Sequence, residues 1–219
     1  MVSTHPGSTR RLVRMTLRAG LWGLLLLNAG CPILGAAAGK LEGTPALEAK
    51  FKPAKVPTLV FAENFKSPTS SMIEADQVAR FVTEELEKNE VVPTLDPMAA
   101  LNIPTTRPAE YKRMSIAAVG RELGARQVLY VSVQATQIEA TPGTGVARGR
   151  GSATVKLIDV DTGDTLWPTE LAGGYPVAYE AVPTNPSAPK TYSTGYVYES
   201  VQRGLAVQIA RLFFTYKAD

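Results

Sequence analysis

The fold is decided by the stretch QVLYVSVQAT, residues 127–136. Branched and aromatic residues dominate this stretch, and it holds neither glycine nor proline, which is typical of a strand. The segment PGTG at 142–145 should then turn the chain. Residues 153–160 are expected to run back as a second strand, with Val155 and Leu157 facing the same side.

Two further segments extend this arrangement toward the carboxyl end. The tight turn at 161–164 should lead to a short strand at 165–167. Residues 172–194 are rich in Pro, Gly, Tyr and Thr, so we expect an ordered loop or an extended edge there. From 195 to 216 apolar residues recur every three or four positions, which predicts a long helix across the sheet: Tyr198, Val201, Leu205, Ile209, Leu212, Phe213 and Tyr216.

Before the central strands, the sequence predicts a buried strand followed by a helix. Residues 58–65 begin with a continuous apolar run, as in a strand that is covered on both faces. A capping box from Ser71 to Glu74 should open a helix that ends near Asn89. The face expected to be buried holds Val78, Phe81, Val82 and Leu86. The opposite, charged face holds Glu84, Glu85, Glu87 and Lys88.

Shorter elements should connect the two halves. We expect a short strand at 91–95, a single helical turn at 97–101, and a loop at Pro104 and Pro108. A second helix should follow over 111–123, closed by a C-capping glycine. The order is then β-α-β-α-β-β-β-α, an α/β (α+β) fold with one mixed sheet and about three helices.

The first thirty residues have the parts of an exported leader. Four arginines and no acidic residue come first, then an apolar run at 21–27, then Ala29, Gly30 and Cys31, the only cysteine. Small residues before a lone cysteine resemble a bacterial lipoprotein signal. Cys31 would then begin the mature chain and carry acyl lipid such as palmitate, which anchors a protein stably when several chains are present.

Two other fates of this leader remain open. Ala36–Ala38 offers an A-x-A exit, and cleavage near Ala38 would release a soluble periplasmic or secreted protein. Residues 19–38 carry no charge and approach the length of a spanning helix, but Asn28, Pro32 and several glycines interrupt them. In each case the body of the protein is expected outside the cytosol.

The predicted organisation has three parts. Residues 1–30 form a signal peptide, residues 31–54 hold the lipidated cysteine and a flexible tether, and residues 55–219 form a single globular domain. Gly, Ala, Pro and Lys dominate the tether. The remaining length is sufficient for one domain with a hydrophobic core.

Composition excludes several classes of function. Removing residues 1–30 takes four of the 23 basic residues and none of the 20 acidic ones, which leaves 19 against 20. A body this close to neutral lacks the basic surface that nucleic-acid binding needs. His5, the only histidine, lies in the leader, so His-based triads and His-ligated metal sites are excluded from the mature chain. A single cysteine also leaves no disulfide partner within the chain.

The remaining candidates for chemistry have simpler interpretations. Asp159, Asp161 and Asp164 are spaced partly like a calcium loop, but a hairpin turn explains the same residues. Four glycines between 143 and 151, with Arg148 and Arg150, connect two strands and favour a hairpin tip over an anion site. We therefore predict no catalytic residue, no metal and no cofactor.

Tyrosines concentrate near the carboxyl end of the chain. Tyrosine is favoured at contact surfaces, and it also covers core edges with its hydroxyl in water. We list as a possible partner surface Tyr175, Tyr179, Tyr192 and Tyr196.

The whole pattern resembles a known family. The chain is similar to the small α/β domain shared by curli-transport lipoproteins of the CsgG type and the amino-terminal domain of TolB. Besides the final amphipathic helix, the resemblance is carried by residues 59–65, 74–88, 120–131 and 153–166. It covers most of residues 57–219. Where the curli family often has a Glu-Arg pair, this chain has Pro93 to Asp96, and its body is too short for us to expect a pore.

Leader, composition and resemblance together predict a non-enzymatic lipoprotein of the cell envelope. The expected location is the outer membrane, facing the periplasm, since Pro32 rather than Asp follows the cysteine. The protein would act as an adaptor or assembly component, binding envelope proteins or itself. The alternative is a periplasmic small-ligand or glycan-binding protein, released by cleavage near Ala38.

Overall fold

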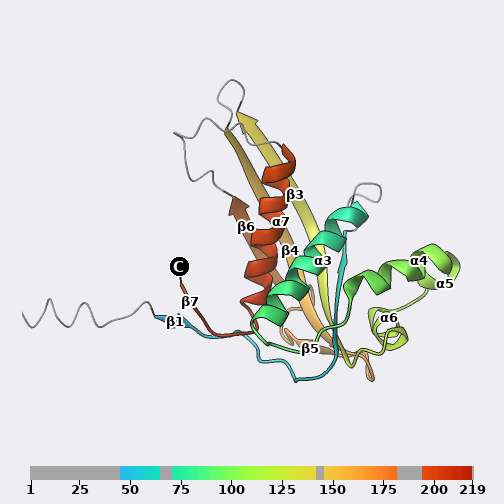
Figure 1. Cartoon of the computed structure of the whole chain (residues 1–219). Coiled ribbons are helices and arrows are strands. Elements are labelled where there is room, and N and C mark those ends of the chain that lie inside the picture. Colours follow the sequence, from blue (N-terminus) through green and yellow to red (C-terminus); the bar gives the residue numbers. More distant parts are fainter. Residues whose placement is uncertain (1–44, 65–70, 142–145, 182–193, 219) are drawn as a thin grey trace, which may run out of the picture. The chain divides into compact units, whose positions relative to one another are not determined.

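A five-stranded mixed sheet organises the chain in this computed structural model, which describes residues 45–64, 71–141, 146–181 and 194–218. The strand order is β2-β3-β4-β5, and β6 pairs with β4 beside β5 (Figure 1). Among the described strand pairs of this sheet, only β2–β3 is parallel. The strands are β2 (Thr58–Glu63), β3 (Gln127–Thr141), β4 (Val146–Asp159), β5 (Thr165–Trp167) and β6 (Tyr175–Ala181).

The chain divides into two units, of which Ala46–Tyr216 holds the sheet. The other comprises residues 1–45 and 217–219, and only 45, 217 and 218 of it are described. Two-residue strands lie at Ala46–Leu47 (β1) and Tyr216–Lys217 (β7). The sheet unit therefore begins before residue 55, inside the segment that we expected to be tether.

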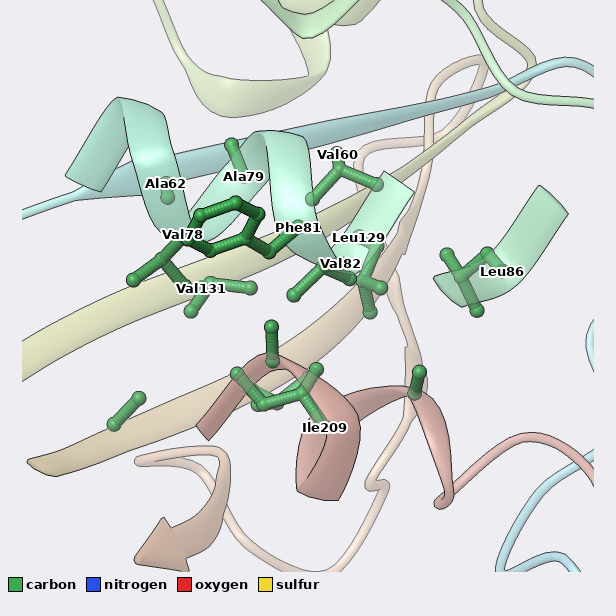
Figure 2. Packing of buried hydrophobic residues seen from close by; sticks show 14 of the residues in the cluster. Val60, Ala62, Val78, Ala79, Phe81, Val82, Leu86, Leu129, Val131 and Ile209 are labelled. Carbon is green, nitrogen blue, oxygen red and sulfur yellow. The ribbon is translucent and has the colours of Figure 1, made fainter. Parts of the chain in front are cut away.

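Two long helices cover one face of the sheet. They are α3 (Ser71–Lys88) and α7 (Thr194–Ala210), and each packs on the other and on the strands. Figure 2 shows Val78, Val82 and Leu86 of α3 pointing into a core shared with Ile209 of α7. These four side chains are at most 1% exposed, which confirms the predicted apolar stripe of α3 and, at Ile209, the part of the last stripe that lies within α7.

A second, smaller core lies on the opposite face, over β2 and the beginning of β3. Along β2, Val60 and Ala62 enter the first core, whereas Leu59 and Phe61 enter this one. Such alternation is expected of a strand that is covered on both faces. The covering elements are η1 (Pro97–Leu101), α4 (Asn102–Thr106), α5 (Pro108–Tyr111) and α6 (Ile116–Glu122).

The mixed α+β class is confirmed, but one predicted strand is replaced by another. Residues 91–95 make only an isolated bridge, Thr58 to Thr94, because Pro93 has no N–H to extend the pairing. The fifth strand is instead β6, within the segment expected to be a loop or an extended edge. Helices are also more numerous than the predicted three.

The helices before β3 differ from the prediction in two respects. The expected loop at Pro104 and Pro108 is helical, because proline is tolerated in the first turn, where an N–H has no helical partner. The expected helix over 111–123 starts only after Ser115, whose Oγ accepts a hydrogen bond from Ala118 N at 3.2 Å. Gly124 ends it with a positive φ of 79°, as predicted.

The last helix is shorter than expected. It ends at Ala210, although Leu212 and Phe213 stay buried in the first core. The Leu212 carbonyl accepts hydrogen bonds from Lys50 N at 2.7 Å and Phe51 N at 3.1 Å instead of continuing a helix. Among the described residues, no helix has both the length and the apolar character needed to span a bilayer.

Candidate functional site: an open sheet surface

The end of β3, the beginning of β4, and β6 form a sheet face that none of the described helices covers. The register sets Gln137, Arg150 and Glu180 in one row across the three strands. The next row holds Ala135, Ser152 and Ala178. These six residues are called the open face below; none of them is buried.

The open face is hollowed, with a volume of about 460 Å³. Short side chains form one row, and long polar ones rise beside them in the other. Arg150 Nη2 lies 3.5 Å from Glu180 Oε1, with the two side chains 55% and 42% exposed. An ion pair this exposed contributes little to stability. Arg150 and Glu180 can therefore give up their mutual contact and bind a partner instead.

The outer edge of β6 is the second part of this surface. Among the described strands, β6 pairs only with β4. Pro176, opposite Thr154, cannot donate into that ladder, so its nitrogen lies on the outer side of the strand. Backbone direction alternates along a strand, so Ala178 and Glu180 also direct their N–H and C=O groups outward. We call these outward groups the β6 edge.

Glycines bring the helix layer close behind this surface. A Cβ on Gly149 would lie 2.3 Å from Val201 Cγ2, and one on Gly151 would lie 2.7 Å from Val201 Cγ1. Both glycines are therefore strand residues beneath α7, and the predicted hairpin tip is wrong for them. Gly143 and Gly145 lie outside the described residues. The signal in the sequence was the alternation of glycine with Arg148, Arg150 and Ser152.

The predicted tyrosine surface is divided between different environments. Tyr175 is partly buried and stacks on Trp167, with ring centroids 5.0 Å apart. Tyr179 is also partly buried and packs against the first core. Tyr196 is 57% exposed at the start of α7, while Tyr192 lies outside the described residues. A partner surface at these tyrosines remains a prediction.

A polar cluster at the end of β2, which sequence reasoning missed, joins α5 to the sheet. Glu63 accepts hydrogen bonds from Tyr111 Oη at 2.7 Å and from Tyr130 Oη at 3.1 Å. Burial, and then the Glu63 carboxylate, raise the pKa of both tyrosines above the ordinary value of 10.0. Both tyrosines therefore stay protonated at neutral pH and donate to Glu63, and the cluster fastens α5 to the sheet.

Burial changes the titration of the Asp76 carboxyl group on α3. Burial raises its pKa from 3.8 to about 6. The folded protein thus binds a proton where the unfolded chain has lost it, so stability falls as pH rises from about 4 to about 6. We expect Asp76→Asn to stabilise the fold at about pH 7.5 by about 1 kcal/mol, discounted for partial exposure.

Urea unfolding of both proteins at about pH 7.5 and about pH 3.5 measures this effect, which should vanish at the lower pH. Glu170→Gln, at an exposed position, is the control and should change stability at neither pH. A variant that is no more stable than the parent at the higher pH would contradict the assignment.

The turn after β4 is held by the Asp159 side chain. Its Oδ1 accepts from the N–H groups of Asp161 at 2.8 Å and Thr162 at 2.9 Å. The hydrogen bond from Thr162 N is the main reason that the pKa of Asp159 is lowered. This confirms the hairpin-turn interpretation. In the described part of the chain, no group of three His, Cys, Asp or Glu residues is placed to hold a metal ion.

Comparison with known proteins gives fold likeness only. No family model matches this chain, and no curated protein matches it. Similar solved structures include the dodecamer of a PelC variant from Paraburkholderia phytofirmans, with 14% identity, 78% of this chain and 98% of that chain covered, and a TM-score of 0.46. Lipoprotein GNA1162 from Neisseria meningitidis has 13% identity and a TM-score of 0.42, and the match covers 66% of this chain and 90% of that chain.

The LpoB C-terminal domain from Salmonella enterica has 14% identity and a TM-score of 0.34, and the match covers 62% of this chain and 88% of that chain. With such low values, these likenesses assign neither a family nor a function to this chain. The resemblance to curli-transport lipoproteins and TolB accordingly stays a prediction. Within the residues that it describes, the structure defines an α+β domain in which part of one sheet face and one strand edge are uncovered.

Proposed function

We propose that this chain is a non-enzymatic lipoprotein of the cell envelope that works as an adaptor or assembly component. The observation that carries the proposal is the open face together with the β6 edge. Strand edges bind other proteins by adding a strand, and neighbouring side chains then provide specificity. Here the exposed Arg150–Glu180 pair lies directly beside such an edge.

The proposed address comes from the leader. Lipid on Cys31 would hold the domain at the outer membrane, facing the periplasm, and tether it close to other envelope proteins. The mature chain has no histidine and no second cysteine. A role in binding proteins fits these residues better than hydrolysis or redox chemistry does.

Changing Cys31→Ala is expected to move the protein from the membrane fraction to the soluble fraction of a bacterial host. The acyl chains are attached to this residue, and without them the leader offers only the Ala36–Ala38 exit. Fractionation and incorporation of labelled palmitate measure the change. The matched control is Ala38→Leu, which removes that exit but leaves Cys31, and should stay in the membrane. Membrane retention of the Cys31→Ala variant would count against the anchor.

The partner is sought by affinity capture from native envelopes. A protein partner that recognises the open face should be lost when Arg150→Ala and Glu180→Ala are combined. Arg113→Ala, an exposed basic residue outside the open face, should retain it. Capture of the same proteins by all three forms of the chain would remove the open face from the proposal.

The hollow on the open face also favours a second candidate function. A volume of about 460 Å³ is within the range of small-ligand sites, and its polar row suits a hydroxyl-rich ligand. We include soluble oligosaccharides as probes in thermal-shift measurements on the full chain. A shift that Arg150→Ala abolishes would favour glycan binding over protein contacts.

A further inference from the structure

The sequence of β6 is suited to pairing with itself. We propose that β6 pairs with β6 of a second copy of this chain, antiparallel, with Ala178 on the two-fold axis. This inference deepens the proposed function by naming the partner that the β6 edge takes. The resulting interface is isologous and joins the two sheets edge to edge.

The backbone groups fit this register. With Ala178 on the axis, the two Ala178 residues exchange N–H and C=O groups, and Glu180 N–H of each copy faces the Pro176 carbonyl of the other. About four inter-strand hydrogen bonds result, since only the missing N–H of Pro176 is lost from each copy. The Ala178 side chain stands on the open face and not between the two strands, so it does not obstruct their approach.

The side chains favour the same register over its neighbours. It overlaps all seven residues of Tyr175–Ala181 with their counterparts. Glu180 then lies opposite proline rather than opposite another acid, and its own Arg150 partly neutralises its charge. A register centred on Glu180 would set two carboxylates face to face, which is unfavourable. One centred on Pro176 would place two residues without N–H groups at the axis.

Cysteine scanning tests the register directly. Cys31→Ser is combined with Ala178→Cys in the full chain, so that the new thiol is the only one. Across the axis its two Cα atoms would be about 5.5 Å apart, within disulfide range. The matched control is Glu180→Cys, also exposed on β6, whose copies would be offset by about 14 Å along the strands.

We expect disulfide-linked dimers from Ala178→Cys under mild oxidation, and few from Glu180→Cys, on non-reducing gels. Equal linkage of both variants, or of neither, overturns the proposal. Fractionation of the Cys31→Ala variant reads the proposed lipoprotein function separately. If the crosslink fails while Cys31→Ala moves the protein to the soluble fraction, only the β6 pairing is removed; if the crosslink forms while the Cys31→Ala variant stays in the membrane, only the anchor is removed.

Two substitutions should move dimer affinity in opposite directions. Ala178→Pro removes the outward N–H at the axis and should weaken the dimer at least about tenfold, while the β4 side of the strand is untouched. Pro176→Val restores the missing donor in each copy and should tighten the dimer about tenfold. Sedimentation equilibrium gives the dissociation constants, and thermal unfolding verifies that both variants fold. Unchanged dissociation constants in folded variants would overturn the proposal.

Discussion

Replacing Gly204 with alanine is expected to lower the free energy of unfolding by about 3 kcal/mol. In an ordinary helix interior the same change raises stability by roughly 0.5–1 kcal/mol. Here the new Cβ would lie 2.1 Å from Cε1 and 2.2 Å from Cζ of Tyr179. That ring cannot yield easily, because it packs against the first core. Urea unfolding at a fixed pH measures the difference.

The matched control is Gly173→Ala, where a Cβ would meet nothing within 4 Å and stability should change little. In a Tyr179→Ala background, Gly204→Ala should cease to be destabilising, because the obstructing ring is gone. If Gly204→Ala is neutral in the parent chain, α7 and β6 are not in the close contact described above.

Replacing Gly149 with alanine is expected to lower the free energy of unfolding by about 2 kcal/mol. This loss is expected even though glycine by itself weakens a strand. The Cβ would lie 2.3 Å from Val201 Cγ2 and 3.0 Å from Val197 Cγ1, both on α7. Adding Val201→Ala should recover part of the loss, since it removes the Cγ2 atom that the new Cβ would meet.

Arg148→Ala is the control for this site, because its side chain is exposed on the other face of β4. We expect a change within about 0.5 kcal/mol. Denaturant midpoints of the parent chain and of these three variants measure the comparison. Equal losses for Gly149→Ala and Arg148→Ala would show that packing against α7 does not require the glycine.

Periodic hydrophobic patterns predicted most of the fold. The runs at 58–65 and 127–136 specify buried strands because their side chains suit a pleated, covered surface. The stripe on 78–86 specifies a helix because only that spacing places its members on one side. Boundaries were less predictable. Ser115 caps α6 from inside the expected helix, and nothing in the local pattern marks that position as a start.

The candidate surface was harder to read from the sequence. The open face combines residues of three strands, and it depends on the β3–β4 irregularity between Val133 and Ala135 that shifts their register. No local pattern specifies such a shift. The Glu63 cluster has the same limitation, since its tyrosines are 48 and 67 residues away in the chain. The positions of Gly149 and Gly151, by contrast, follow from period-two alternation once 146–159 is assigned as one strand.

The hydrogen bonds at Leu212 have a mechanical consequence. Tension applied along the chain from an anchor at Cys31 would load the hydrogen bonds that Lys50 and Phe51 donate to that one carbonyl before it reaches β2. The ring of Phe51 also stacks on Trp167, with centroids 6.1 Å apart. These contacts would bear the load before β2 does. A force transmitted from the bilayer would therefore detach the segment at Lys50 and Phe51 first and leave the sheet intact.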